Sequence, residues 1–380
     1  MLRTITSKSL VAYSQCGHKA FLTHCANEKG IVNEYDRIVQ QNKLDNQKEY
    51  LNTLNAKNIN ILPYTRDHFR AKNNYLANAL LKTRGLEAEC GLLEKHQSAQ
   101  SFSYLPTIFA GTHNITKEHR LELLFAGYVL SKLQRSPPEI GKIISLGHKI
   151  ITLKLNNCFK AIRPILNQLQ EWDAVPNPDP PLIILNRHCP YCQFQTSCKT
   201  KAEKENNLSL LDGISTLKFI NKYKRKGIFT VNQLSYLYRP RRQRKRSRTP
   251  RSMKHSVELQ ALVIRTGSIY LRESPTLSRH HTELFLDIEG IPDRQSFYLI
   301  GLLICKQDSS TYYPFWTDTD EDEADIWRQF IEILDKYSDC PIFHYGHYDA
   351  KAIAKLGKRY QTEIEGISKQ LVNLNTLIPR

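Results

Sequence analysis

The chain has 380 residues, 41% of them hydrophobic, and its 54 Lys and Arg residues against 37 Asp and Glu residues give a formal net charge of +17. This length allows two or three domains with buried cores, and the charge surplus points to a polyanionic partner, most often nucleic acid. Nine cysteines are too few for a disulfide scaffold in a chain of this length, and the odd number leaves at least one unpaired.

The N-terminal segment resembles neither a signal peptide nor a membrane anchor. Residues 1–8 contain no apolar core, and no uninterrupted apolar stretch in the chain approaches the ~18 residues that a membrane span needs. We therefore expect a soluble, cytoplasmic protein with no membrane partner. The sequence does not identify protein partners.

The first 204 residues are predicted to mix helices and strands. We expect helices at 9–25, 34–57, 67–82, 121–133 and 156–172, and strands at 58–62, 86–110, 141–146 and 149–154. Pro137 and Pro138 end the fourth of these helices. Helices that alternate with strands predict an α/β fold for this part of the chain.

Three cysteines lie within ten residues at Cys189, Cys192 and Cys198, spaced C-x2-C-x5-C. Thiolates this close repel one another and oxidise unless a soft metal ion or an iron–sulfur cluster binds them. Either kind of centre usually has four ligands, and the best candidate for the fourth is Cys16. Clustered thiols also favour a reducing compartment. The other cysteines are interpreted as core or inert thiols: Cys25, Cys90, Cys158, Cys305 and Cys340.

Zinc is the alternative to iron and sulfur at these cysteines. Zinc sites built from four cysteines usually consist of two C-x2-C pairs, whereas Cys16 stands alone. This asymmetry favours an iron–sulfur cluster. The histidines have no clear partner set at ligand spacing, so we interpret six of them as surface or core residues: His18, His24, His188, His280, His281 and His344.

Residues 205–255 are predicted to form a connecting segment. Two Gly-Ile pairs, at 213–214 and 227–228, bracket a short basic helix, and the arrangement resembles a helix-hairpin-helix variant. Glycine lets a hairpin backbone approach a phosphate closely. An ordinary helical linker fits the same pattern equally well.

Residues 218–254 contain fourteen Lys and Arg residues and no Asp or Glu. Charges this dense repel each other, so the run is either an arm that becomes ordered on phosphates or a solvated linker. We favour nucleic-acid contact, because each neutralised phosphate releases counterions. The predicted contacts are Lys224, Arg225, Lys226, Arg239, Arg241, Arg242, Arg244, Lys245 and Arg246.

Residues 256–380 are predicted to form an acidic α/β domain. Between 281 and 340 there are fourteen Asp and Glu residues and only four Lys and Arg residues. The pattern predicts strands at 284–289, 296–304, 311–316 and 341–346, with helices at 323–337 and 348–356. A basic segment followed by an acidic domain fits a metal-dependent site beside a nucleic-acid track.

Asp287 and Glu289 lie two residues apart on the first of these strands, so both point to the same face. Two carboxylates in this arrangement can share a divalent cation. A solvent-facing strand with incidental acids is the alternative. A third acid, Asp349, lies in the first turn of the helix after the fourth strand.

Two of these segments resemble known nuclease motifs. Asp287-Ile-Glu289-Gly resembles the first motif of DEDD-type, RNase H-like exonucleases, and His344-Tyr-Gly-His-Tyr-Asp349 resembles their second. The most similar sub-family is the YprB-like ribonuclease H domain. This resemblance implies that Asp287, Glu289 and Asp349 hold two Mg²⁺ or Mn²⁺ ions and catalyse phosphodiester hydrolysis.

The whole chain resembles the RecB-like nucleases that carry an iron–sulfur cluster. In that family a PD-(D/E)XK-type domain with one early cysteine and a late C-x2-C-x5-C triplet precedes an RNase H-like domain. The resemblance implies a 4Fe-4S cluster on Cys16, Cys189, Cys192 and Cys198. It also implies a RecB-like domain over 1–204, a helix-hairpin-helix-like linker over 205–255 and an RNase H-like domain over 256–380.

The sequence departs from this family pattern in two places. The first domain lacks the expected Asp after a glycine and the following Glu-x-Lys strand, which leaves a degenerate DNA-binding module as one reading of it. After residue 360 we find neither the final strand nor a suitable Asp for the fourth acid, so we expect the RNase H-like domain to be incomplete.

We therefore predict a metal-dependent nuclease or exonuclease that acts on DNA or RNA. The iron–sulfur domain would serve as a structural and nucleic-acid-gripping platform. One alternative is a non-catalytic nucleic-acid-binding protein in which both nuclease-like domains have decayed. Another is an adaptor stabilised by zinc.

Overall fold

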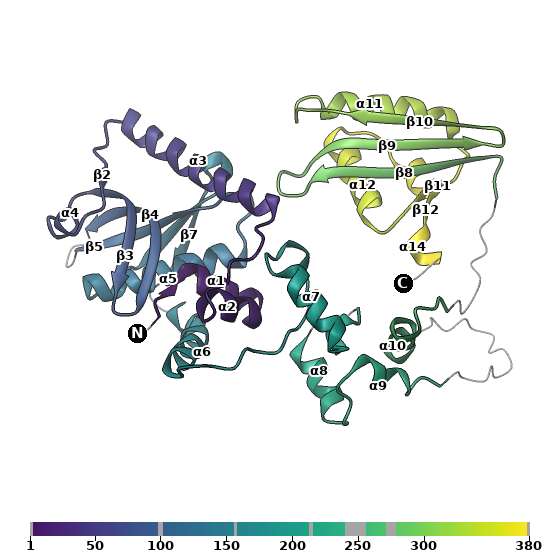
Figure 1. Ribbon diagram of the computed structural model, residues 1–380. Coiled ribbons are helices and arrows are strands. Elements are labelled where there is room, and N and C mark those ends of the chain that lie inside the picture. The colour runs from purple at the N-terminus through teal and green to yellow at the C-terminus, as the bar shows by residue number, and fades with distance from the viewer. Residues whose placement is uncertain are drawn as a thin grey trace. The chain divides into compact units, whose positions relative to one another are not determined.

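The structure is a computed structural model that describes residues 3–97, 102–155, 158–212, 216–239, 256–270 and 279–377. The chain divides into two compact units, residues 1–269 and 270–380, and each has a sheet of its own (Figure 1). The three domains that the sequence suggested, with the two boundaries between them, stay predictions. In the described part of the chain, no helix combines the length and the apolar character that crossing a membrane requires.

The first unit is built on a mixed sheet in the order β2-β3-β4-β5-β6-β7, with β1 (Ile5–Thr6) beside β4. Strands β3, β4 and β5 form an antiparallel meander, and β6 runs parallel to β5. The strands are β2 (Leu62–Pro63), β3 (Tyr75–Thr83), β4 (Leu86–Gln97), β5 (Phe102–Phe109), β6 (Ile140–Ile144) and β7 (Ile150–Lys154).

Helices cover both faces of this sheet. Alternate strand residues bury on opposite faces, so Leu76 joins the main core beneath α1, α5 and α6, whereas Ala77 joins a smaller cluster beneath α3. These helices are α1 (Ser7–Gln15), α2 (Gly17–His24), α3 (Glu34–Ala56), α4 (Arg66–Arg70), α5 (Lys117–Gln134) and α6 (Arg163–Ala174). Short 3-10 turns follow β6 and β7, at η1 (Leu146–His148) and η2 (Cys158–Ala161).

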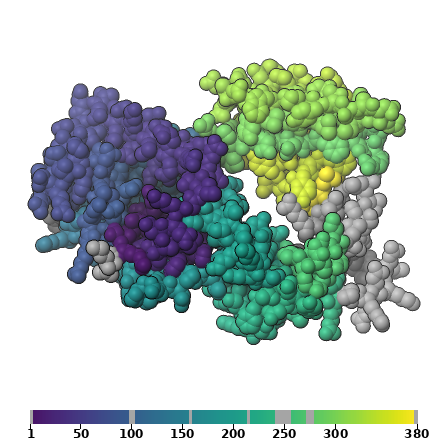
Figure 2. Space-filling model, viewed as in Figure 1, coloured from purple at the N-terminus to yellow at the C-terminus, as the bar shows by residue number. Residues whose placement is uncertain are grey.

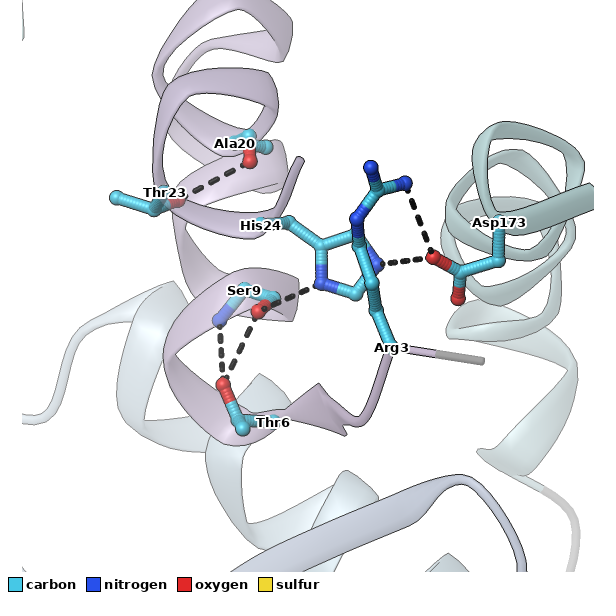
Figure 3. A network of polar contacts seen from close by, with 7 residues as sticks. All are labelled: Arg3, Thr6, Ser9, Ala20, Thr23, His24 and Asp173. Carbon is cyan, nitrogen blue, oxygen red and sulfur yellow. Dashed lines mark hydrogen bonds and ion pairs between the residues drawn. The ribbon is translucent and has the colours of Figure 1, made fainter. Parts of the chain in front are cut away.

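A buried polar network fastens the N-terminal elements of the first unit to α6 (Figure 3). Thr6 Oγ1 accepts the Ser9 N–H at 3.1 Å and so caps α1. His24 Nε2 lies 3.0 Å from Asp173 Oδ1, and Arg3 Nη1 approaches the same oxygen at 3.9 Å. Ser9 Oγ completes the chain at 3.4 Å from His24 Nδ1. His24 is thus a buried side chain that joins α2 to α6.

Three predictions of elements in this unit are wrong. The helix expected at 9–25 is interrupted at Cys16, whose extended backbone (φ −163°) ends α1 and caps α2. Residues 75–83 form β3, not the end of a helix at 67–82, because alternate side chains bury against the helical layers. The strand expected at 58–62 is reduced to the two residues of β2.

The rest of the first unit is a small helical assembly with a core of its own. Its elements are η3 (Cys189–Tyr191), α7 (Gln195–Lys204), η4 (Leu208–Leu210), α8 (Leu217–Lys224), α9 (Val231–Ser235) and α10 (Val257–Thr266). Ile220 and Tyr223 of α8 bury against Ile228, Val231 and Leu234, among others. The charged side of α8 remains outside this core.

The second unit is a five-stranded sheet in the order β10-β9-β8-β11-β12. Strands β8 (Thr282–Ile291), β9 (Ser296–Lys306) and β10 (Ser309–Trp316) form an antiparallel meander. Strands β11 (Ile342–His344) and β12 (Leu371–Asn373) run parallel to β8. In Figure 2 the green strands and the yellow segment from α12 onward make one continuous body.

Helices α11 (Glu323–Leu334) and α12 (Tyr348–Arg359) pack on one face of this second sheet. Leu284, Leu286 and Ile288 of β8 face these helices, together with Trp327 of α11 and Ile353 of α12. The remaining elements are η5 (Asp335–Tyr337), α13 (Glu365–Gln370) and α14 (Leu374–Leu377). The six elements predicted between 284 and 356 are all present. The expectation of no strand after residue 360 is wrong, because β12 pairs with β11 there.

Candidate functional site

Strand β8 carries the first two acids of the candidate site. Asp287 and Glu289 are exposed, whereas their neighbours Leu286 and Ile288 are buried in the core. The strand alternates in this way because its apolar side chains pack beneath α11 and α12. Both carboxylates therefore point away from the helices, as the sequence predicted.

Asp349 comes to the same place from a different part of the chain. Strand β11 runs parallel to β8 and delivers the first turn of α12 to the end of that strand. Asp349 is 4% exposed, and its Oδ1 accepts the N–H of Ile288 at 3.0 Å. The third carboxylate is thus bonded to the peptide that separates Asp287 from Glu289.

Burial and neighbouring charge both act on Asp349. Burial raises the pKa of this carboxyl above its ordinary value, and the negative charge of Asp287 raises it further. The Ile288 N–H and His344 oppose this effect without cancelling it. Proximity to Glu289 likewise adds to burial in raising the pKa of Tyr348. The acids are therefore close enough to repel one another, which a bound cation would relieve.

His344 is a member of this site that the sequence interpretation left among surface or core histidines. It lies at the end of β11, and its Nδ1 is buried, has no hydrogen-bond partner among the described residues and lies 3.6 Å from Asp349 Oδ2. Burial lowers the pKa of His344 below its ordinary value. Its position five residues before Asp349, within the motif that resembles the exonucleases, was the available signal.

Asn373 supports the loop between His344 and Asp349. It lies opposite His344 in the β11–β12 pairing, and its Oδ1 accepts the Gly346 N–H at 3.1 Å. Gly346 has φ +87°, a conformation that favours glycine. No sequence pattern indicated this role, because β12 was not predicted.

The four predicted cluster cysteines gather around one pocket in the first unit. Cys16 lines this pocket together with Cys189, Cys192 and Cys198, although 173 residues separate it from Cys189. Burial and the nearby thiols raise the pKa of Cys189, and they raise that of Cys198 to about 11. The Asn186 N–H donates to Cys189 Sγ at 3.2 Å, and the Lys19 N–H to Cys16 Sγ at 3.5 Å.

Neither group of side chains is drawn together as tightly as a bound ion would require. Across the described ranges, no set of three or more His, Cys, Asp and Glu side chains is arranged so that it could hold a metal ion. The structure thus brings the predicted ligands into the same neighbourhoods without closing either coordination shell.

The predicted nucleic-acid contacts are only partly within the described residues. Arg225 and Lys226 are exposed just after α8, and Lys224 is half-buried. Gly227 follows with φ +75° and leads into the buried Ile228, as a hairpin between α8 and α9 requires. Arg239 is exposed. The other predicted contacts and the first Gly-Ile pair lie outside the described residues: Arg241, Arg242, Arg244, Lys245, Arg246, Gly213 and Ile214.

Two acids of the first unit, one on α5 and one on β4, are engaged in ion pairs. Glu122 of α5 pairs with Lys43 of α3 at 2.6 Å, inside a groove that Glu89 also lines. Glu94 of β4 pairs with Lys142 of β6. These lysines occupy positions beside the carboxylates that a cation would otherwise take.

Comparison with known families concerns the second unit. Residues 284–378 match the RNase_H_2 model of the RNase H superfamily. This span includes Asp287, Glu289, His344 and Asp349, so an RNase H-like domain carries the whole carboxylate site. The first unit lies outside the match. No curated protein matches the chain.

Proposed function

We propose that this chain is a metal-dependent nuclease that hydrolyses phosphodiester bonds of DNA or RNA with the carboxylates of its second unit. One observation carries the proposal: the bond from Ile288 N–H to Asp349, which fixes the acid of α12 between the two acids of β8. The RNase H superfamily match over the same residues supports the same class of chemistry.

Asp287, Glu289 and Asp349 would hold Mg²⁺ or Mn²⁺, since hard divalent cations prefer carboxylate oxygen. Bound ions of this kind activate water and stabilise the leaving oxygen of a phosphodiester. The residues fit this role because burial and the negative charge of Asp287 raise the pKa of the Asp349 carboxyl, and a bound cation would offset both effects. His344 supports Asp349 from the buried side, and the exposure of Asp287 and Glu289 leaves room for a substrate.

We further propose that Cys16, Cys189, Cys192 and Cys198 bind a 4Fe-4S cluster. A tetrahedral zinc ion with bonds of about 2.3 Å would bring its four sulfurs to about 3.8 Å from one another. Each thiolate of a four-iron cluster binds a different iron, so the ligands surround a larger body. The four thiols line one pocket, and Cys16 stands apart from the triplet, whereas zinc sites of four cysteines usually consist of two C-x2-C pairs; this asymmetry favours the cluster.

In this proposal the first unit binds nucleic acid and does not cleave it. Glu122 is paired with Lys43 in the groove that Glu89 also lines, so these two acids are not both free to hold a cation. The exposed Arg225 and Lys226 beside the Gly227 turn would contact phosphates. The basic run that follows would extend this contact.

A non-catalytic nucleic-acid-binding protein is the second candidate. Asn373 favours it, because this residue lies opposite His344 at the end of β12, where a neutral amide cannot supply the charge of a fourth acid. In this case nucleic acid would bind without being cut.

A cleavage assay separates the two functions. The full chain is incubated with labelled single- and double-stranded DNA and RNA while Mg²⁺ or Mn²⁺ is titrated. Asp287→Asn should abolish cleavage, whereas Asp308→Asn, in the turn between β9 and β10, should not change it. Cleavage that survives Asp287→Asn, or no cleavage by the unmodified chain at any metal concentration, would overturn the nuclease proposal.

A further inference from the structure

The face of the second sheet that carries Asp287 and Glu289 is not covered by α11 or α12. Residues of β8, β9 and β10 that point away from those helices form rows across the strands. One row joins Glu289 to Leu299 and Trp316, the next joins Asp287 to Gly301 and Pro314, and the third joins Phe285 to Leu303 and Tyr312. Phe285 is partly buried and packs against Phe343, so the carboxylates share this surface with two exposed aromatic side chains, Tyr312 and Trp316.

A β-bulge adds a third aromatic ring to this surface. The pairing of β8 with β9 shifts between Glu289 and Gly290, so that Tyr298 has no partner on β8. An extra residue of this kind turns its side chain out of the strict alternation. The Tyr298 ring accordingly packs at 5.2 Å, edge to face, against Trp316, whose own partner across the strands is Leu299.

Two of the three aromatic rings lie open to solvent. Trp316 and Tyr312 are each 55% exposed, and Tyr298 is half-buried. A methyl group built on Gly301 would lie 2.7 Å from Tyr312 Oη, so the Tyr312 ring leans across Gly301. Gly301 is the cross-strand partner of Asp287, and its lack of a side chain lets this ring reach toward the carboxylate row.

We infer that Tyr298, Tyr312 and Trp316 form a stacking platform for the unpaired bases of a single-stranded nucleic acid that leads into the carboxylate site. The inference rests on the proposed nuclease function and names its substrate class. Aromatic rings on a sheet bind bases by their flat faces, which are accessible in a single strand and hidden inside a duplex.

Charge on the same face argues for bases over phosphates as the groups bound there. Asp287 and Glu289 repel a phosphate backbone, so without a cation the strand is held by its bases. The platform also differs from a docking site for a helix, because Gly301 and Pro314 form its middle row with the acidic Asp287. A helix would require a continuous aliphatic surface there.

Trp316 reports directly on this binding. The chain has three tryptophans, and the other two, Trp172 and Trp327, are 8% and 2% exposed. The full chain with Asp287→Asn, which prevents cleavage, is titrated with oligothymidine, oligouridine or a duplex of equal length. The single strands should quench tryptophan fluorescence, and the duplex should not. Trp316→Phe should remove the quenching but keep the binding, measured by anisotropy of a labelled strand.

Affinity gives the second readout. Trp316→Ala and Tyr312→Ala should each weaken single-strand binding by about 5- to 100-fold, since stacking of one base contributes about 1–3 kcal/mol. The matched control is Thr311→Ala on the same strand, which should leave the affinity unchanged. A lower dissociation constant for oligouridine than for oligothymidine, or the reverse, would identify RNA or DNA as the preferred strand.

Failure of this inference is distinct from failure of the nuclease proposal. In one outcome, Asp287→Asn abolishes cleavage, single strands do not quench Trp316 fluorescence, and Tyr312→Ala binds single strands as tightly as the wild type. The stacking platform is then wrong, and the nuclease proposal stands. If single strands quench Trp316 but the unmodified chain never cleaves them, the platform stands on a binding protein. Equal quenching by the duplex would also refute the platform.

Discussion

Replacement of Asp349 by Asn tests whether the negative charge of this buried carboxylate destabilises the fold in the absence of a metal ion. Asp349→Asn keeps an oxygen that can accept the Ile288 N–H, which the wild-type Oδ1 accepts at 3.0 Å, but removes the charge. Asp349→Ala removes the acceptor as well. The two variants therefore separate the hydrogen bond from the charge at one buried position.

The direction of the change in unfolding free energy follows from the raised pKa of Asp349. A carboxyl whose pKa is higher in the fold than in the unfolded chain destabilises the fold above both pKa values, by about 1.4 kcal/mol for each pKa unit. The penalty shrinks as the pH falls below the folded pKa and is gone below the unfolded pKa. In metal-free buffer at pH 8, Asp349→Asn should thus be at least as stable as the wild type, and the difference should vanish in acid. Asp349→Ala should lose about 1–3 kcal/mol, because it leaves the Ile288 N–H unsatisfied.

Hydrogen exchange of the β8 and β9 amides, in EDTA and in Mg²⁺, measures the stability of the second unit within the full chain. Mg²⁺ at 100 times its dissociation constant should stabilise the wild type by about 2.7 kcal/mol and Asp349→Asn by much less. Two results would refute the reasoning: a loss of more than about 1 kcal/mol in metal-free Asp349→Asn, or equal stabilisation of both proteins by Mg²⁺. Either would identify Asp349 as a purely structural residue.

Three further substitutions test other parts of the structure. Cys16→Ser should remove the broad visible absorption of a cluster in purified protein, whereas Cys25→Ser, which is outside the thiol pocket, should retain it; a colourless wild type that contains zinc would contradict the cluster. Asp173→Ala should lower the unfolding free energy of the first unit by about 1–3 kcal/mol in calorimetry, because it leaves buried donors unpaired, and an unchanged thermal midpoint would show that the network in Figure 3 is dispensable. Glu323→Gln should cost the second unit about 2–4 kcal/mol, since this 1%-exposed carboxylate accepts from an arginine, a tyrosine and a backbone N–H. Exposed Glu321→Gln should change its stability by less than about 0.5 kcal/mol, and equal effects of the two would reject the role of burial.

The carboxylate strand could be predicted because its information is local. Alternation of apolar and polar residues over 284–289 is enough to place Asp287 and Glu289 on one face of a strand. The amphipathic patterns of α11 and α12 are local in the same sense. The spacing of Cys189, Cys192 and Cys198 likewise indicates a shared ligand before any fold is known.

Elements that depend on tertiary contacts were harder to predict. Residues 75–83 have no strong preference by themselves and become β3 because β4 pairs with them on one side of the sheet. Strand β12 is only three residues long and exists because β11 offers it a parallel edge. The break at Cys16 interrupts a sequence that otherwise resembles one continuous helix.

By itself, the sequence determined which residues are able to act: acids with the strand period, thiols at ligand spacing, and a basic run. Only the tertiary structure decided which of them meet. It brings Cys16 to a triplet 173 residues later, and it bonds Asp349 to the peptide between two acids of another strand. The physical reason is that periodicity and spacing act over a few residues. Contacts between distant segments, by contrast, depend on the packing of whole sheets and helices, which no short window of sequence contains.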